Sequence, residues 1–292
     1  NSGTLLFDTS ADKSVTGTIA EPGGGADGTE IQVIDSADGA PATVTFTATV
    51  AADTLTVGTS SKAGAALFQE AVTVPTINII GGDVDEDSTT TFNKAVTATS
   101  GITLDDNTGV TKVIFAQNNT VNIASTIDGG ADNEGTIQVT GATKTFKSAI
   151  GSTSVGTLNI DATPVFESTV GATTIDIAGS VTATFNDAIT ATTIALNGSS
   201  NLTISYTGAI TIEGNITDTS TSNEINVLFA TADTAPSLVT FSGAAVAADT
   251  IKIGSTTKAG KATFSGLTGV TATTLTIAGG DHENEDSTAT FN

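Results

Sequence analysis

Apolar and polar residues alternate with a period of two over many short runs of this chain. Val181, Ala183 and Phe185 are separated by single polar residues, and Ile194 and Leu196 continue the pattern after a short gap. Such alternation is typical of a β-strand with one buried face. No sustained apolar stripe with a 3.6-residue period accompanies it. The sequence therefore predicts an all-β chain.

The predicted strands recur at intervals of about twenty residues. Residues 91–104, 145–160, 165–177 and 184–196 share a template that begins T-F (once V-F), continues to A-[VI] or a close variant, and ends in T-[IL]-x-[IVL] before a turn. Phe46, Phe68, Phe92 and Phe115 are 22, 24 and 23 residues apart. Phe146, Phe166, Phe185 and Tyr206 follow at spacings of 20, 19 and 21 residues. Each template predicts one coil of a β-solenoid.

In such a solenoid the aromatic side chains of successive coils lie above one another. We expect them to point inward and to form one ladder near a single corner of the coil, because one coil alone buries too little apolar surface. At about 22 residues per coil, the 292 residues make roughly 13 coils. The expected ladder consists of Phe46, Phe68, Phe92, Phe146, Phe166, Phe185, Phe241 and Phe264.

A longer repeat contains the short one. Residues 51–68 recur as 247–264, and the similarity extends to make residues 1–93 match approximately 198–292, with residues 94–197 as a weaker middle copy. The fold expected is an elongated parallel β-solenoid with coils of 20–24 residues, continuous over 1–292. Three immunoglobulin-like sandwiches of about a hundred residues are the alternative, although they leave the shorter period unexplained. A coil has only begun at Asn292, so we expect the parent protein to continue with similar coils.

Composition narrows the possible partners. Thirty-one acidic residues against nine basic ones give a net charge of −22, which argues against binding nucleic acid or docking on anionic lipid. The chain has no Cys, so disulfides and thiolate metal sites are excluded. No apolar run is long enough to predict insertion into a membrane.

The residues offer little for catalysis. His282 is the one histidine, and the corresponding position of the earlier copy is Val84. A paired-carboxylate hydrolase site needs a groove with aromatic platforms for sugar, and aromatic residues are 4% of the chain. The Gly-rich segment 21–28 lacks the Lys-Ser or Lys-Thr of a phosphate-binding loop. We expect no catalytic residues and no enzymatic activity.

Two acidic turns occupy matching places in the long repeat. Calcium takes six to eight oxygen ligands from carboxylates and carbonyls on flexible loops, and each turn gathers four carboxylates. A solvated acidic loop is the alternative interpretation. Because the middle copy lacks such a cluster, we expect the turns to be optional to the fold and to bridge neighbouring chains through Ca²⁺. The candidate ligands are Asp83, Asp85, Glu86 and Asp87 in one turn, and Asp281, Glu283, Glu285 and Asp286 in the other.

The Thr-, Ala- and Gly-rich coils, such as residues 184–196, resemble the β-solenoid repeats of bacterial surface-layer proteins and secreted adhesins. The resemblance lies in composition and coil pattern and covers nearly the whole chain. It implies an extracellular or cell-surface location, self-association into a lattice or filament, and dependence on calcium. The function expected is therefore that of a structural repeat protein. An adhesin stalk or a phage fibre segment that binds glycans, host receptors or the cell envelope is the alternative.

Overall fold

The chain consists of stacked parallel strands in two compact units. The computed structural model describes residues 3–20, 28–37, 39–116, 120–123 (backbone only), 126–141, 143–230, 236–280 and 286–292. Unit 1 spans Asn1–Leu158 and unit 2 spans Asn159–Asn292. The described residues contain strands and no helix, and the strands form a β-solenoid of about 11 turns. The predicted fold class is confirmed.

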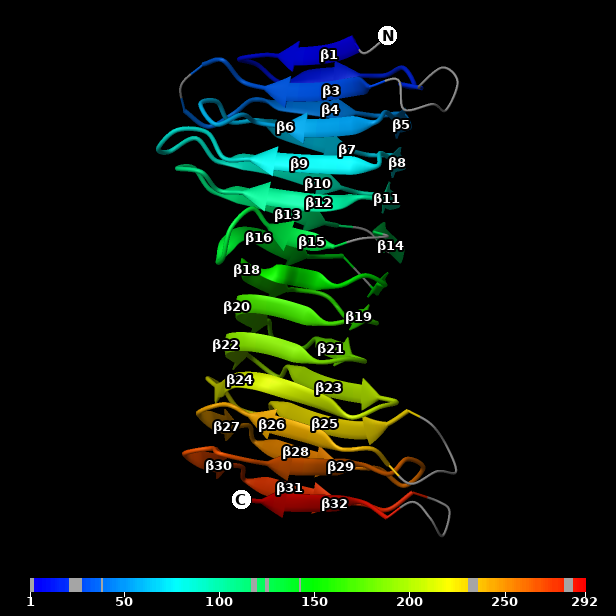
Figure 1. Ribbon diagram of the computed structural model, residues 1–292, viewed down its shortest axis with the longest axis vertical. Coiled ribbons are helices and arrows are strands. Elements are labelled where there is room, and N and C mark those ends of the chain that lie inside the picture. Colours follow the sequence, from blue (N-terminus) through cyan, green and yellow to red (C-terminus); the bar gives the residue numbers. More distant parts are fainter. Residues whose placement is uncertain are drawn as a thin grey trace. The chain divides into compact units, whose positions relative to one another are not determined.

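In unit 1 three short strands make one turn, and equivalent strands of successive turns pair in parallel (Figure 1). The first series is β1 (Gly3–Asp8), β3 (Thr29–Ile34), β6 (Thr54–Val57), β9 (Thr76–Ile80), β12 (Gly101–Asp105) and β15 (Ile127–Gly129). The second is β2 (Lys13–Val15), β4 (Thr43–Phe46), β7 (Ala65–Phe68), β10 (Ser88–Phe92), β13 (Thr111–Phe115) and β16 (Glu134–Val139). The third is β5 (Val50–Ala51), β8 (Val72–Thr73), β11 (Val96–Ala98), β14 (Thr120–Ile123) and β17 (Lys144–Phe146). The long strand β18 (Ile150–Ile160) follows them.

In unit 2 some of the strands are longer. One series is β19 (Pro164–Phe166), β21 (Thr182–Phe185), β23 (Asn201–Tyr206), β25 (Glu224–Phe229), β28 (Thr250–Ile253) and β31 (Thr274–Ile277). The strands β20 (Val170–Ile177), β22 (Ile189–Leu196) and β24 (Ile210–Asp218) pair along their length. One part of β24 then pairs with β26 (Val239–Ser242). β26 pairs with β29 (Lys261–Phe264), which pairs with β32 (Thr288–Phe291). Another part pairs with β27 (Ala245–Ala247), which pairs with β30 (Gly269–Thr271).

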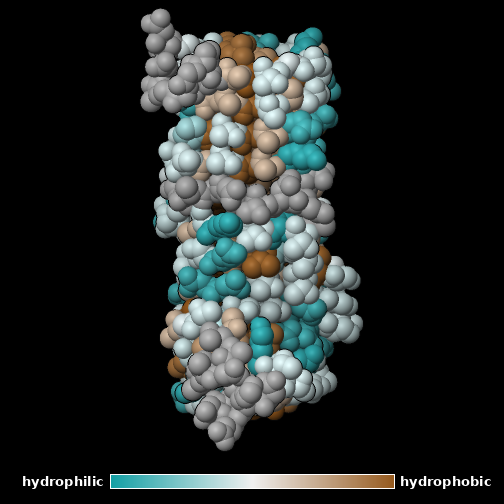
Figure 2. All heavy atoms as spheres, turned by 90° about the vertical axis from the view of Figure 1, so that its right-hand side faces the viewer, coloured by the Kyte–Doolittle hydropathy of each residue, from teal (hydrophilic) through white to brown (hydrophobic). Residues whose placement is uncertain are grey.

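The core consists of apolar columns that run from turn to turn. Ile31, Leu55, Ile77 and Ile102 are register partners on four successive strands, and each is at most 1% exposed. Partners in a parallel pair point to the same side of the sheet, so the period-two pattern places one apolar column inside and one polar column outside. Polar and weakly polar residues accordingly cover most of the face in Figure 2, apart from a narrow apolar stripe.

The aromatic residues are buried as predicted, but they do not form one ladder. Phe46, Phe68, Phe92 and Phe115 stack in unit 1 with ring centroids 4.7, 5.3 and 5.9 Å apart. The register partner of Phe115 is Val139, so the next aromatic residue, Phe146, lies on the neighbouring strand β17. Its ring meets that of Phe115 edge to face at 5.3 Å. The prediction of a single corner is therefore wrong within unit 1.

Unit 2 has three separate aromatic groups among its described residues, one of which is the pair of Tyr206 and Phe229 on β23 and β25, with ring centroids 5.3 Å apart. Phe166 and Phe185 stack on β19 and β21 at 4.7 Å. Phe241, Phe264 and Phe291 stack on β26, β29 and β32, each pair at 4.9 Å. All eight predicted side chains are at most 2% exposed, which confirms that they point inward.

The turns are also fewer than the roughly 13 expected, because some are longer than the template. Phe166 and its partner Phe185 are 19 residues apart, whereas Val15 and its partner Phe46 are 31 residues apart. Added length in the connections between strands disturbs the paired strands least.

Candidate functional site

The first acidic turn, residues 81–87, connects β9 to β10 in unit 1. It lies between the turn 58–64 of the preceding coil and the turn 106–110 of the following coil. These three turns, which we call the turn stack, protrude on the left of unit 1 in Figure 1. Gly81 N–H donates to Asp105 O at 2.7 Å, and Gly109 N–H donates to Gly82 O at 2.9 Å. The acidic turn is thus held to its neighbour by backbone hydrogen bonds.

The four carboxylates of this turn do not share one environment. Glu86 is 6% exposed and lies 3.6 Å from the ammonium of Lys62 through Oε1. Its Oε2 accepts a hydrogen bond of 3.2 Å from Ala63 N–H. Glu86 therefore faces the preceding turn instead of solvent, and its charge is balanced by Lys62 within the turn stack.

The remaining three carboxylates are exposed. Asp87 Oδ1 accepts a hydrogen bond of 2.8 Å from Val110 N–H in the following turn. Asp83 contributes its backbone carbonyl to Glu86 N–H at 3.0 Å, and Asp85 adopts the left-handed conformation with φ of 67°. The side chains of Asp83 and Asp85 are therefore the ones directed toward solvent and available to a cation.

A shallow groove of about 480 Å³ lies beside this turn, on the outer face of β4, β7 and β10. Thr43, Leu67 and Thr89 form part of its wall, and Asp85 and Asp87 stand at its rim. Among the described side chains, no group of three or more Asp, Glu or His residues is close enough to hold a metal ion. The exposed carboxylates of this turn can thus offer part of a coordination sphere to a cation shared with another molecule.

The second acidic turn falls mostly outside the described residues. Asp281, His282, Glu283 and Glu285 belong to that part, so nothing is said of their placement. Asp286 is described, is exposed and lies two residues before the start of β32.

A serine that follows each acidic turn has a role that sequence reasoning missed. Ser88 Oγ donates to Ile80 O at 2.5 Å and accepts from Gly64 N–H at 3.0 Å. Ser287 repeats both contacts, donating to Ala278 O and accepting from Gly260 N–H at 3.0 Å. Each serine therefore ties the two ends of its acidic turn to the turn of the preceding coil. The serine follows an Asp in both copies of the long repeat, and this recurrence is the sequence signal that could have revealed its role.

A glycine faces each of these serines. Gly58 has φ of +83°, and a Cβ there would lie 2.1 Å from Ile80 O and 2.3 Å from Ser88 Oγ. Gly254 has φ of +79°, and its Cβ would lie 2.1 Å from Ala278 O and 2.2 Å from Ser287 Oγ. Only glycine fits this left-handed and crowded position. The serine and the glycine recur together in both copies of the long repeat. The anchoring of each acidic turn to the preceding coil is therefore a repeated feature of the fold.

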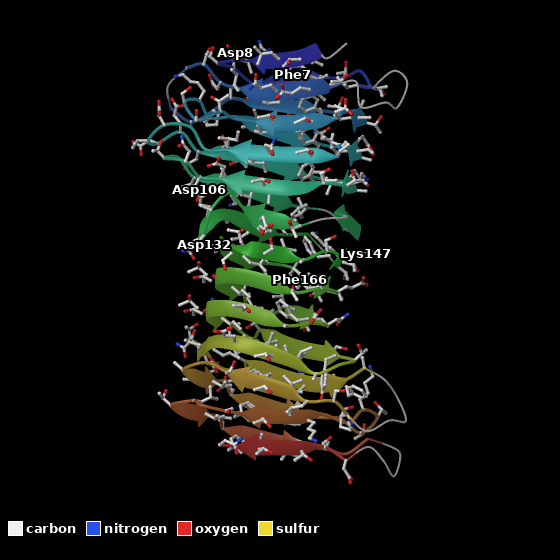
Figure 3. The ribbon with its side chains drawn as sticks, in the orientation of Figure 1. Phe7, Asp8, Asp106, Asp132, Lys147 and Phe166 are labelled. Atoms are coloured by element: carbon white, nitrogen blue, oxygen red, sulfur yellow. The ribbon has the colours of Figure 1, made fainter. Side chains whose placement is uncertain are left out.

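Other turn carboxylates also bind backbone N–H groups. Asp106, labelled in Figure 3 on the turn side of unit 1, accepts hydrogen bonds from Thr111 N–H at 2.7 Å and Gly135 N–H at 2.9 Å. Asp35, which is 4% exposed, accepts from Ala37 N–H at 2.8 Å and Ala42 N–H at 2.7 Å. Such contacts satisfy donors that the turns leave unpaired. These acids serve the turns themselves.

Lys144 is a buried cation outside the turn stack. It begins β17, is 2% exposed and donates from Nζ to Thr140 O. Burial lowers the pKa of its ammonium to about 8. Because the desolvated charged form is disfavoured, its proton is lost more easily than that of an exposed lysine.

No known protein family matches this chain, and neither a curated protein nor a solved structure is significantly similar to it. In the part of the chain that the structure describes, no helix is long and apolar enough to span a membrane.

Proposed function

We propose that this chain is a structural repeat protein of the cell exterior, and that copies of it associate into a surface layer or filament. Support comes from the regular parallel stacking of the coils, of which the last described strands, β31 and β32, form one edge that we call the C-edge. β31 pairs with β28 and β32 pairs with β29, and no other described strand pairs with either of them. Their outer backbone donors and acceptors are those that the strands of a further coil would pair with, in the same chain or in another copy.

The side chains of the C-edge are apolar where they follow the core columns. Leu275, Ile277 and Phe291 are 45%, 48% and 51% exposed. Their register partners one turn earlier, Ile251, Ile253 and Phe264, are at most 1% exposed. Leu275 and Phe291 line a cavity of about 470 Å³ together with Leu267 and Val270. Covering these residues with a further coil, of the same chain or of another copy, removes apolar surface from water.

Calcium is the cation that we propose to assist this assembly. Each chain carries a net charge of −22, so copies repel one another unless their charge is screened. The exposed carboxylates of Asp83 and Asp85 and the groove beside them offer oxygen ligands, which suit a hard divalent cation. A cation shared between two chains obtains from both the ligands that one turn lacks.

Sedimentation velocity and negative-stain electron microscopy over a range of protein concentrations test this proposal. We expect species larger than the monomer that grow with concentration, and we expect more of them in CaCl₂ than in NaCl of equal ionic strength. A chain that stays monomeric at all concentrations and in both salts would overturn the structural role. Binding to a glycan array by that monomer would instead favour the adhesin stalk.

A further inference from the structure

The groove beside the first acidic turn combines an apolar part with an acidic rim. Ala65 and Leu67 line the apolar part and point outward from β7, because the alternate residue Phe68 is buried in the core. Asp85 and Asp87 stand at the rim. The volume of about 480 Å³ is typical of clefts that bind small ligands, which span about 300–1,000 Å³. The groove therefore suits a ligand with an apolar stem and a positively charged end.

The second copy of the long repeat shows which side chain fits this place. In the match between the two copies, Ala65 corresponds to Lys261 and Leu67 to Thr263. Lys261 begins β29 and is exposed on the outer face of the sheet, because its neighbour Ala262 is buried in the core. Unit 2 thus carries a lysine side chain of its own at the position where unit 1 has a small alanine.

The carboxylates at the rim are available to a cation. In the described part of the chain, no lysine forms an ion pair with Asp85 or Asp87. Asp87 accepts the hydrogen bond from Val110 N–H through Oδ1, which leaves Oδ2 to a ligand. By register the nearest lysine is Lys112 of β13, which pairs with Thr89 and does not line the groove. A positively charged ligand is therefore complementary to the rim.

We propose that this groove binds a lysine side chain from an extended, lysine-containing segment of another protein. The ammonium lies between Asp85 and Asp87, and the methylene stem covers Ala65 and Leu67, since lysine readily packs its stem on apolar surface. A second copy of this chain is a poor source of that lysine, because each copy brings a net charge of −22 to a rim that is itself negative. This interaction goes beyond the self-association proposed above and does not depend on it.

Fluorescence anisotropy of the labelled peptide Ala-Lys-Ala-Lys-Ala tests the proposal. The full chain is titrated in dilute NaCl, at concentrations below those at which larger species form. Two matched peptides separate the two parts of the contact. Acetyl-lysine in place of lysine keeps the stem and removes the charge, whereas diaminopropionate keeps the charge and removes most of the stem. We expect the lysine peptide to bind roughly tenfold more tightly than either matched peptide.

Three variants of the chain locate the binding site. Ala65→Lys gives unit 1 the residue that its repeat copy already has, so we expect this variant to fold. Its own ammonium then occupies the groove, and binding of the peptide should be lost. Leu67→Thr, which also copies unit 2, should weaken binding several-fold. Thr240→Lys adds the same charge on the outer side of β26 in unit 2 and should bind the peptide as the parent does. Circular dichroism and thermal unfolding compare all three variants with the parent.

Four results would overturn the proposal. Unchanged binding to Ala65→Lys would place the peptide elsewhere on the acidic surface. Equal affinity for the acetyl-lysine peptide would show that the rim carboxylates do not recognise an ammonium. Cadaverine that competes as strongly as the lysine peptide would assign the groove to a free diamine instead of a protein segment. A parent chain that does not bind the peptide would leave the proposed self-association as it stands.

A further variant covers the case in which Ala65→Lys unfolds. Asp85→Asn combined with Asp87→Asn removes both rim charges while keeping the shape of the two side chains. We expect this double variant to bind the lysine peptide roughly tenfold more weakly than the parent. Unchanged binding by the double variant counts against the groove in the same way as unchanged binding by Ala65→Lys.

Discussion

The ring of Phe46 lies on the ring of Phe68 with centroids 4.7 Å apart and planes 7° from parallel. The two residues are also register partners on β4 and β7, so the hydrogen-bonded strand pair and the ring stack have the same spacing. The distance between neighbouring strands, about 4.8 Å, brings rings on adjacent turns into contact without strain. Backbone pairing and side-chain packing in this solenoid therefore reinforce each other at each such step.

Phe185→Ala tests the energetic weight of the aromatic columns. Phe185 is fully buried and stacks on Phe166, so its loss leaves a cavity inside unit 2. We expect the free energy of unfolding to fall by about 3–5 kcal/mol, measured by denaturant titration. Thr184→Ala, on the outward side of the same strand, is the control and should change stability little. Equal stability of Phe185→Ala and the parent would show that the column contributes nothing.

Thr90→Val should stabilise unit 1. The Thr90 side chain is fully buried, and among the described residues its Oγ1 is the buried side-chain oxygen without a hydrogen-bond partner. Valine has the same shape without the unpaired hydroxyl, so we expect a gain of about 1 kcal/mol in the free energy of unfolding. Thr111→Val is the matched control, because Thr111 Oγ1 donates to Asp106 Oδ1 at 2.6 Å. That variant should lose stability, and a gain in both variants would refute the argument.

The buried ammonium of Lys144 predicts a rise of stability with pH. The pKa of its ammonium is about 8 in the folded chain, compared with 10.5 for an ordinary exposed lysine, so folding disfavours the charged form. The resulting penalty is fully present below pH 8 and disappears as the pH rises toward 10.5. Chemical denaturation at a series of pH values should show this rise, and Lys144→Met should abolish it.

The upper limit of that pH window is set by Tyr206. Burial raises the pKa of its hydroxyl above the ordinary 10.0, so the folded chain resists forming the tyrosinate. Stability from this residue is therefore lost above pH 10, and the Lys144 effect is best measured below that value. A flat profile between pH 8 and 10 in the parent would contradict the assignment to Lys144.

Glu86→Gln and Asp83→Asn should separate the structural acid of the turn stack from the solvent-facing one. Glu86→Gln removes the charge that balances Lys62 on a mostly buried side chain, and we expect a loss of about 1 kcal/mol in unfolding free energy. Asp83→Asn should leave stability unchanged and reduce the effect of Ca²⁺ on assembly. Isothermal titration calorimetry and sedimentation with and without a chelator provide the second measurement. The reverse pattern would assign the cation to Glu86.

The inward direction of the aromatic side chains could be predicted because alternation in a strand requires only the sequence itself. The move of the aromatic residue from the strand of Phe115 to the neighbouring strand of Phe146 could not be predicted. Val139, the register partner of Phe115, is an equally good core residue, and the pattern does not say which strand of the coil carries the aromatic side chain. The fold class follows from the repeat alone, whereas the position of each coil boundary depends on loops of unequal length.

The acidic turn at residues 81–87 could also be predicted only in part. Four neighbouring acids look equivalent in the sequence, yet Glu86 is distinguished by Lys62, which lies one coil earlier. The positive φ of Asp85 turns the chain between Asp83 and Glu86. Asp tolerates this left-handed conformation, but the turn holds three Asp residues and the sequence does not say which of them adopts it. Sequence reasoning therefore located the turn correctly but could not assign its side chains to the interior or to solvent.

The contacts of Ser88 and Ser287 fix the two ends of each acidic turn, and in the first turn they leave Asp83, Val84 and Asp85 exposed. The first turn has five residues between its glycine pair and its serine, and the second has six. The solenoid thus carries a surface loop of variable length at a fixed position of the coil, with a pair of glycines before it and a serine after it. New residues can be introduced at exposed positions such as Val84, while Glu86 and the inner columns of the coil stay as they are.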